Sequence, residues 1–249
     1  MKKQKFLIYP LLIMGMFLVF ASSCEKDDDD NNNSNNNTTN TFTDSRDGNV
    51  YQTVTIGDQV WMAENLKYLP SVVGQVAGSE TNPYYYVYGF DGTDVNDAKA
   101  TSYYTAYGVL YNWPAAMAGF ASSTANPSGV QGVCPNGWHL PSEAEWTELT
   151  DYLGGDSVAA GKMKEAGTSH WNSPNTGADN SSGFTALPDG YRGYNGGWNG
   201  MGRYAGFWSA TNATGSNAWY RRLDYNDASM HWNDRGKSSA VSVRCVKDN

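Results

Sequence analysis

The sequence is poor in charged residues. Only 17% of its 249 residues are charged, and Asp and Glu outnumber Lys and Arg by 25 to 17. Nucleic acid is not an expected partner at the resulting formal net charge of −8, because phosphate binding needs a basic footprint. Low charge combined with 14% aromatic residues and 27 glycines is typical of a loop-rich domain packed with aromatic side chains, and not of a helical bundle.

Residues that usually carry chemistry are also scarce. The three histidines, His139, His170 and His231, are not spaced as helical zinc ligands, and no Gly-x-Ser-x-Gly nucleophile motif is present. Glu143 and Glu145 could form an acid pair, but capping and dipole roles at a helix start account for both. We therefore expect no enzyme activity and no cofactor.

The sequence has one apolar run of note, at residues 6–20, and this run is short for a membrane span. Lysines precede this run and the string Ala21-Ser22-Ser23-Cys24 follows it, which is the order of a secretory signal. The string resembles a bacterial lipobox, although Ala21 stands where that motif usually has Leu. The resemblance implies that residues 1–24 are a lipoprotein signal peptide and that Cys24 is lipidated. An ordinary cleaved signal or a single anchor helix is the alternative.

Residues 25–41 are acidic at first and then almost entirely Asn, Ser and Thr. Such a segment cannot bury a core, so we expect a disordered tether followed by one domain at residues 42–249. An acidic run directly after the lipidated cysteine resembles the surface-export signals of Bacteroidetes-type lipoproteins. The resemblance implies an outer-membrane lipoprotein exposed at the cell surface. A solvated spacer is the alternative.

Cysteine is rare, with three residues in the chain. With Cys24 assigned to a lipid, Cys134 and Cys245 remain as an even pair in an oxidising compartment, which predicts a disulfide. Such a bridge would close a loop of about 110 residues and contribute roughly 4–5 kcal/mol in the chain-entropy model. Two buried free thiols are the alternative.

Hydrophobic periodicity indicates a mixed fold. Residues 50–56 and 59–62 read as strands joined by the turn residues Gly57 and Asp58. Further strands are expected at residues 84–88, 108–111, 207–210, 218–224, 228–233 and 241–246. Helices in the middle of the chain between strands at both ends predict the α+β class.

The stretch at residues 132–146 is central to this prediction. It reads as a buried strand that leads into a helix, which Ser142 and Glu145 start with a capping box. Gly154 ends this helix. A second helix is expected at about residues 156–166, with its inward residues at Val158, Ala159 and Met163. A short helix is expected at residues 112–118.

Six separated motifs carry a family resemblance. They lie at residues 55–66, 111–113, 134–146, 183–192, 207–209 and 242–248. Together they resemble the Fibrobacter succinogenes major paralogous domain over about residues 45–248. The resemblance implies a C-type-lectin-like fold with short antiparallel strands, two main helices and long loops. It also implies a surface or secreted binding domain, and a relationship to formylglycine-generating sulfatase-modifying domains.

A second resemblance concerns residues 217–239, which are similar to the C-terminal variable regions of retroelement-diversified lectin-fold proteins. In such proteins, adenine-directed mutagenesis of Asn codons randomises surface positions. The resemblance implies ligand contacts at residues of the types that those codons yield: Tyr220, Arg222, Asp224, Asn226, Asp227, Ser229, His231, Asn233, Asp234, Arg235, Gly236 and Ser239. Tyr, Trp, Arg, Asn and Ser also dominate antibody paratopes, where rigid rings combine with adaptable hydrogen-bonding groups. Ordinary polar loop and edge-strand residues are the alternative.

A possible calcium site lies in the same stretch. Trp232-Asn233-Asp234 resembles the tripeptide that helps to bind calcium in sugar-binding C-type lectins, and Asn and Asp oxygens suit calcium. The companion loop of those lectins is missing, because Ser173-Pro174-Asn175 lacks the leading acid or amide. Asn233 and Asp234 are therefore a weak calcium candidate, and we expect no metal.

These observations predict a lipid-anchored surface protein whose domain binds a protein or glycan through residues 217–239. One alternative is a calcium-dependent carbohydrate-binding lectin. Another is an enzyme related to formylglycine-generating factors, which use a reactive cysteine pair; the positions of Cys134 and Cys245 favour a structural bridge instead. The sequence identifies neither the ligand nor the oligomeric state.

Overall fold

The computed structural model of the protein describes residues 40–249. The expected signal peptide, Cys24 and nearly all of the expected tether lie outside the described residues. The described residues start with strand β1 (Asn40–Thr43), which pairs in antiparallel register with β2 (Val50–Ile56). Among the described residues, no helix has the length and apolar character needed to cross a membrane.

Short antiparallel strands form three sheets. The first sheet contains, in spatial order, β1, β2 (Val50–Ile56), β3 (Gln59–Met62), β13 (Val246–Lys247) and β6 (Trp138–His139). The second contains β11 (Met230–Gly236), β10 (Asn217–Asp224) and β9 (Tyr204–Asn212). The third contains β4 (Tyr85–Tyr86), β5 (Leu110–Asn112), β12 (Ala240–Val241), β7 (Asp189–Arg192) and β8 (Trp198–Met201).

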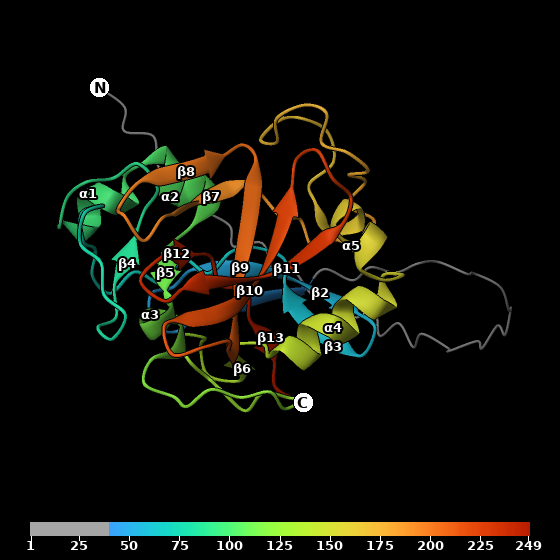
Figure 1. The fold of residues 1–249 in the computed structure, drawn as a ribbon, viewed down its shortest axis with the longest axis horizontal. Coiled ribbons are helices and arrows are strands. Elements are labelled where there is room, and N and C mark those ends of the chain that lie inside the picture. The colour runs from blue at the N-terminus through green and yellow to red at the C-terminus, as the bar shows by residue number, and fades with distance from the viewer. Residues whose placement is uncertain (1–39) are drawn as a thin grey trace, which may run out of the picture. The chain divides into compact units, whose positions relative to one another are not determined.

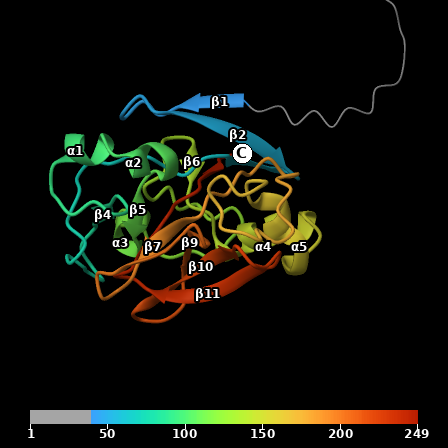
Figure 2. The same cartoon turned by 90° about the horizontal axis from the view of Figure 1, so that it is seen from above.

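The helices are short and are grouped at two places around these sheets. They are α1 (Val95–Lys99), α2 (Ser102–Tyr107), α3 (Trp113–Met117), α4 (Glu143–Tyr152) and α5 (Asp156–Met163). Helices α4 and α5 lie together beside the sheets, while α1 and α2 lie at the other end of the domain (Figure 1). Strands β10 and β11 lie on the side opposite β1 and β2 (Figure 2). This mixture of antiparallel sheets and a few helices confirms the predicted α+β class.

Two large apolar clusters hold the elements together. In one, α4 and α5 pack on β2, β3 and β9 through an aromatic group in which the ring centroids of Trp61 and Trp146 are 4.6 Å apart and those of Trp146 and Phe207 are 5.8 Å apart. The other cluster surrounds Cys134 and Cys245, whose sulfur atoms are 2.06 Å apart, at disulfide distance. The predicted pairing of these cysteines is therefore confirmed.

The locally specified elements match the sequence prediction. Strands β2 and β3 have the predicted bounds and pair across the predicted turn. Helix α4 has the predicted capping box: the Ser142 hydroxyl accepts a hydrogen bond from the backbone N–H of Glu145, and the Glu145 carboxylate accepts one from the N–H of Ser142. Both elements depend on contacts between residues close in sequence, which a sequence pattern can encode.

Several predicted strands differ in extent from the observed ones. The strand expected at residues 84–88 is reduced to Tyr85–Tyr86, and those expected at 207–210 and 228–233 are found at Tyr204–Asn212 and Met230–Gly236. The strand expected at residues 241–246 is divided into β12 and β13 because the chain passes here from the third sheet to the first. The alternation that predicted one strand reflects burial on both sides, since residues 240–246 are all buried. The strand expected before α4 within residues 132–146 is reduced to Trp138–His139, because turns occupy the residues ahead of it.

The helix predictions need two corrections. Val158 is 40% exposed and does not face the core; Ala159, Ala160 and Met163 form the inward side of α5. Helices α1 and α2 lie in a segment for which no helix was predicted. Side chains of Asp94 and Thr101 cap them, and these two N-cap residues were the available sequence signal.

Candidate ligand-binding face

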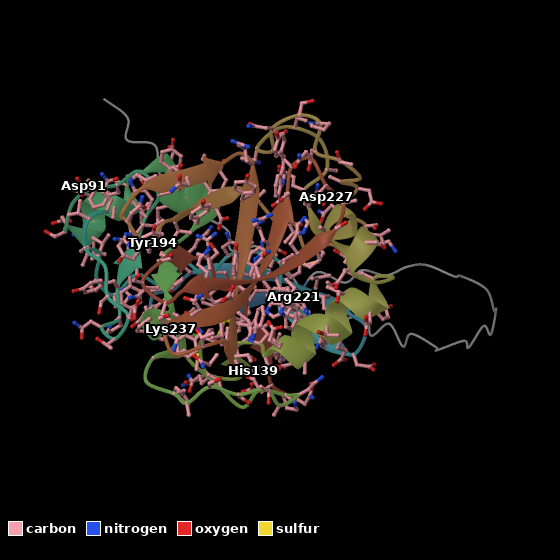
Figure 3. The ribbon with its side chains drawn as sticks, viewed as in Figure 1. Asp91, His139, Tyr194, Arg221, Asp227 and Lys237 are labelled. Atoms are coloured by element: carbon pink, nitrogen blue, oxygen red, sulfur yellow. A yellow bond between two sulfur atoms is a disulfide. The ribbon has the colours of Figure 1, made fainter. Side chains whose placement is uncertain are left out.

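The stretch predicted to bind the ligand forms a two-stranded ribbon at one edge of the second sheet. Strands β10 and β11 pair in antiparallel register, with Tyr220 opposite Asn233 and Arg222 opposite His231. Strand β9 covers the other edge of β10, so β11 is the edge strand. Asp227 and Lys237 flank the two ends of β11 (Figure 3).

Alternation along the strands divides the predicted residues between two faces, because successive side chains of a strand point to opposite sides. One face of the ribbon carries Tyr220, Arg222, His231, Asn233 and Arg235. Asp234 lies on the other face, next to Trp219 and Trp232, whose ring centroids are 5.2 Å apart. The stretch therefore cannot present all of its predicted contacts to one ligand surface.

Two tyrosines from neighbouring strands complete the first face. The guanidinium carbon of Arg235 lies 3.9 Å from the ring centroid of Tyr191 on β7, and that of Arg222 lies 5.3 Å from the ring of Tyr204 on β9. The two tyrosine rings are 6.4 Å apart. We call this surface the arginine–tyrosine face, and it consists of Tyr191, Tyr204, Arg222, His231, Asn233 and Arg235. Every member is partly exposed.

Three residues that were predicted to contact the ligand are buried, so the prediction is wrong for them. Tyr220, Asp224 and Ser239 are only 3%, 8% and 1% exposed. The Tyr220 ring packs in the core against Trp208, and its hydroxyl accepts a hydrogen bond of 3.0 Å from Nη2 of Arg235. Tyr220 and Asp224 support the face from within the fold through their contacts with Arg235 and Arg222.

Ionic contacts fix the polar side chains next to the turn. Nε of Arg222 lies 2.7 Å from Oδ1 of Asp224, and Nε2 of His231 lies 3.0 Å from Oδ2 of Asp227. Burial acts to lower the pKa of Arg222, but its hydrogen bond to Asp224 and the charge of that residue outweigh burial and raise it. The pKa of Asp227 is held below its ordinary value, first by the N–H of Ser229 and also by His231.

The turn between β10 and β11 contains the remaining predicted contacts. Asn226 is exposed at its tip, while Asp227 and Ser229 are partly exposed. A fully buried lysine, Lys164, holds the base of the turn by donating hydrogen bonds of 2.9 and 2.7 Å to the carbonyls of Asp224 and Asp227. Sequence reasoning did not find Lys164, because its role depends on residues about 60 positions away.

The weak calcium candidate has no supporting geometry. Asn233 and Asp234 lie on opposite faces of β11, and the Asp234 carboxylate accepts a hydrogen bond of 2.9 Å from Asn217. Among residues 40–249, no group of three or more His, Cys, Asp or Glu side chains is arranged to hold a metal ion.

A buried polar network links three of the sequence motifs and was also missed. The Asn65 amide donates hydrogen bonds to Asp189 (3.0 Å) and Ser242 (3.2 Å), and its oxygen accepts one from Arg244 (2.8 Å). Burial raises the pKa of Asp189 to about 8 and lowers that of Arg244. All four side chains are at most 4% exposed, and they join segments that are distant in sequence.

His139 is a structural residue. Its Nδ1 lies 2.7 Å from Asp248 and its Nε2 lies 2.5 Å from Glu145, so the imidazole joins β6 to the start of α4 and to the chain's C-terminal segment. These carboxylates raise its pKa against the opposing effect of burial. The structural role predicted for His139 agrees with this arrangement.

Comparison with known proteins gives a single family match. A family model described as the Fibrobacter succinogenes major domain matches residues 54–247, which agrees with the resemblance seen in the sequence motifs. No curated protein and no solved structure matches the chain.

Proposed function

The chain belongs to the Fibrobacter succinogenes major domain family, and from this premise we propose that it is a surface-anchored lipoprotein with a ligand-binding domain. The observation that carries the proposal is the arginine–tyrosine face, where partly exposed arginines, a histidine and an asparagine lie beside tyrosine rings. Amphipathic rings combined with adaptable hydrogen-bonding groups suit the recognition of a protein or glycan. Arg222, His231, Asn233 and Arg235 would make the contacts, and Asn226, Asp227 and Ser229 would extend them along the turn.

The proposed fold family is C-type-lectin-like, as the family resemblance implies. The short antiparallel strands, the two longer helices α4 and α5 and the disulfide between the middle and the end of the chain support it. Lipidation of Cys24 and export to the outer surface would place the domain outside the cell. Labelling with a fatty acid tests the anchor: Cys24→Ser should remove the label and release the protein from the membrane fraction.

Binding through the arginine–tyrosine face is tested with a purified domain on an array of oligosaccharides and purified surface proteins. Arg222→Ala and His231→Ala should weaken the strongest signals at least tenfold. Tyr152→Ala is the control, because Tyr152 is 66% exposed on α4 and lies outside the face. Equal binding by all variants would contradict the proposal, as would a parent domain that binds nothing on the array.

Diversification by a retroelement is the second part of the proposal. The members of residues 217–239 that lie on the arginine–tyrosine face and at the turn would be the randomised positions, whereas the buried Tyr220, Asp224 and Ser239 would vary less. A reverse-transcriptase gene next to a near-copy of the coding sequence, with adenines at the variable codons, is the expected observation. A locus without either would leave an ordinary family member.

Both alternatives have direct tests. For a calcium-dependent lectin, millimolar calcium should raise the melting temperature relative to a chelator; an unchanged value rejects it. For an enzyme related to formylglycine-generating factors, mass spectrometry of the non-reduced protein should find free thiols at Cys134 and Cys245. We propose that the protein is not such an enzyme, because both cysteines are fully buried and lie at disulfide distance.

A further inference from the structure

The C-terminal residues 191–249 are basic, whereas the rest of the chain is acidic. Residues 191–249 contain eight Lys and Arg and four Asp, a net charge of 8 − 4 = +4, whereas the whole chain carries −8. The rest of the chain therefore carries −8 − 4 = −12. The arginine–tyrosine face lies within the basic part of an acidic protein. Arg192, Arg221 and Arg244 are buried, so the arginines that reach the surface at or beside the face are Arg203, Arg222 and Arg235. Exposed cations attract anions to the surface that carries them.

Arg235 is held as a planar donor between two tyrosine rings. Its guanidinium carbon is 3.9 Å from the ring centroid of Tyr191 and 4.7 Å from that of Tyr220, and Nη2 donates to the Tyr220 hydroxyl. This packing fixes the plane of the guanidinium group. Among the described residues, no carboxylate lies within salt-bridge distance of Arg235, although on the same face Arg222 has one and His231 has two.

A second arginine at the border of the face is in the same situation. Arg203 is exposed, and its guanidinium carbon lies 5.5 Å from the ring of Tyr204 and 5.4 Å from the ring of Tyr225. Within residues 40–249 it too has no carboxylate partner within salt-bridge distance. The face thus presents two tyrosine-supported cations whose charges the domain does not neutralise.

The shape of these donors selects among anions. A fixed guanidinium group matches the planar oxygen pair of a carboxylate through two parallel hydrogen bonds, whereas a lysine ammonium acts as a point charge. Partly exposed tyrosine rings offer apolar faces to sugar rings, and their hydroxyls can donate to sugar hydroxyls. Asn233 adds a hydrogen-bonding amide within the same face.

We propose that this face binds a carboxylate-bearing glycan, a polymer that contains uronic acids, with a sugar carboxylate on Arg235 and sugar rings against Tyr191 and Tyr204. The proposal rests on the proposed function, because it names the ligand class of the same face. It goes further by requiring that the negative charge be a carboxylate and that it be carried by a sugar.

Calorimetric titration with oligogalacturonate tests the proposal. The acid form should bind the purified domain at least tenfold more tightly than the methyl-esterified form of the same length. Arg235→Lys keeps the charge but loses the planar donor pair, so it should weaken binding about tenfold. Lys247→Gln is the control, because it removes one exposed positive charge outside the face and should leave binding unchanged. Melting curves establish that each variant is folded.

Several results would overturn the inference. Equal affinity for the acid and the ester would show that the carboxylate is not recognised. Equal binding of a sulfated glycan, with no effect of Arg235→Lys, would show general charge attraction. Binding of a poly-glutamate peptide but not oligogalacturonate would assign the carboxylate to a protein partner. If neutral oligosaccharides bind and Arg222→Ala abolishes that binding, the proposed function survives while this inference fails.

Discussion

At the scale of single residues, two glutamates in the first turn of α4 have different roles because their surroundings differ. Glu145 completes the capping box, accepts a hydrogen bond from the N–H of Ser128 and contacts His139, as its predicted capping role requires. Glu143 was predicted to act through the helix dipole, but it is only 7% exposed. Burial raises its pKa to about 8, although the charge of Arg221 opposes this shift.

We expect Glu143→Gln to stabilise the domain more at pH 8 than at pH 5. Below the ordinary pKa of 4.5 the carboxyl group is protonated in both the folded and the unfolded chain. As the pH rises from there toward 8, the unfolded chain loses this proton and the folded chain retains it, so the parent's free energy of unfolding falls. An amide avoids this loss, which is on the order of 2 kcal/mol.

Urea denaturation at pH 5, 6.5 and 8 measures this difference. Asp151→Asn is the control, because Asp151 is exposed on the same helix and should show no comparable pH dependence. A gain from Glu143→Gln that is the same at pH 5 and pH 8 would contradict the prediction.

At the scale of elements, helix starts and turns depend on a few polar side chains. The capping box at α4 satisfies backbone groups that the helix itself leaves without partners. The turn between β10 and β11 depends instead on Lys164, which donates to three carbonyls: those of Asp224, Asp227 and Thr176. The first device is local in sequence, and the second joins segments from three parts of the chain.

Ser142→Ala should lower the free energy of unfolding by about 1 kcal/mol, the usual cost of removing an N-cap hydroxyl. Chemical denaturation measures this value. Ser216→Ala is the matched control, because Ser216 is exposed beyond the ends of the strands, and its effect should stay within about 0.5 kcal/mol. An equal effect of both substitutions would show that the cap contributes nothing.

Lys164→Met should destabilise the domain by about 2–4 kcal/mol, because it leaves three carbonyls, one buried and two partly buried, without their donor. It should also loosen the turn that borders the arginine–tyrosine face. Hydrogen exchange followed by mass spectrometry should show faster exchange at residues 225–229 than in the parent, while the peptide of β2 and β3 is unchanged. Faster exchange across the whole domain, without a local excess at the turn, would reject this role.

At the scale of the whole molecule, one covalent link and one polar network join the end of the chain to its earlier parts. The bridge between Cys134 and Cys245 spans a sequence separation of 111 residues. The network joins Asn65 to Arg244, which are 179 positions apart. Both lie beside the point where the chain passes from the third sheet to the first, so they fix the positions of these two sheets relative to each other.

Loss of the disulfide should therefore destabilise the whole domain. The double substitution Cys134→Ala with Cys245→Ala should lower the free energy of unfolding by about 4 kcal/mol, the chain-entropy value for a loop of this size. A reducing agent should lower the melting temperature of the parent and leave that of the double variant unchanged. If the parent's melting temperature does not respond to reduction, the bridge does not contribute to stability.

The sequence by itself determined the elements whose contacts are local. The hairpin of β2 and β3, the capped start of α4, the α+β class and the family follow from alternation, turn residues and motif order. Cysteine counting determined the pairing of Cys134 with Cys245, because only two cysteines remain once Cys24 is set aside.

Tertiary structure alone decided which side chains of residues 217–239 reach the surface. Tyr220 and Arg222 have the same strand parity, yet one lies in the core and the other on the face, because Trp208 packs over the first and Gly206 lies opposite the second. Three other features have the same cause: the last predicted strand is divided, Tyr191 and Tyr204 join the face, and Lys164 holds the turn. Each depends on neighbours supplied by distant segments, and no periodicity within one stretch encodes those neighbours.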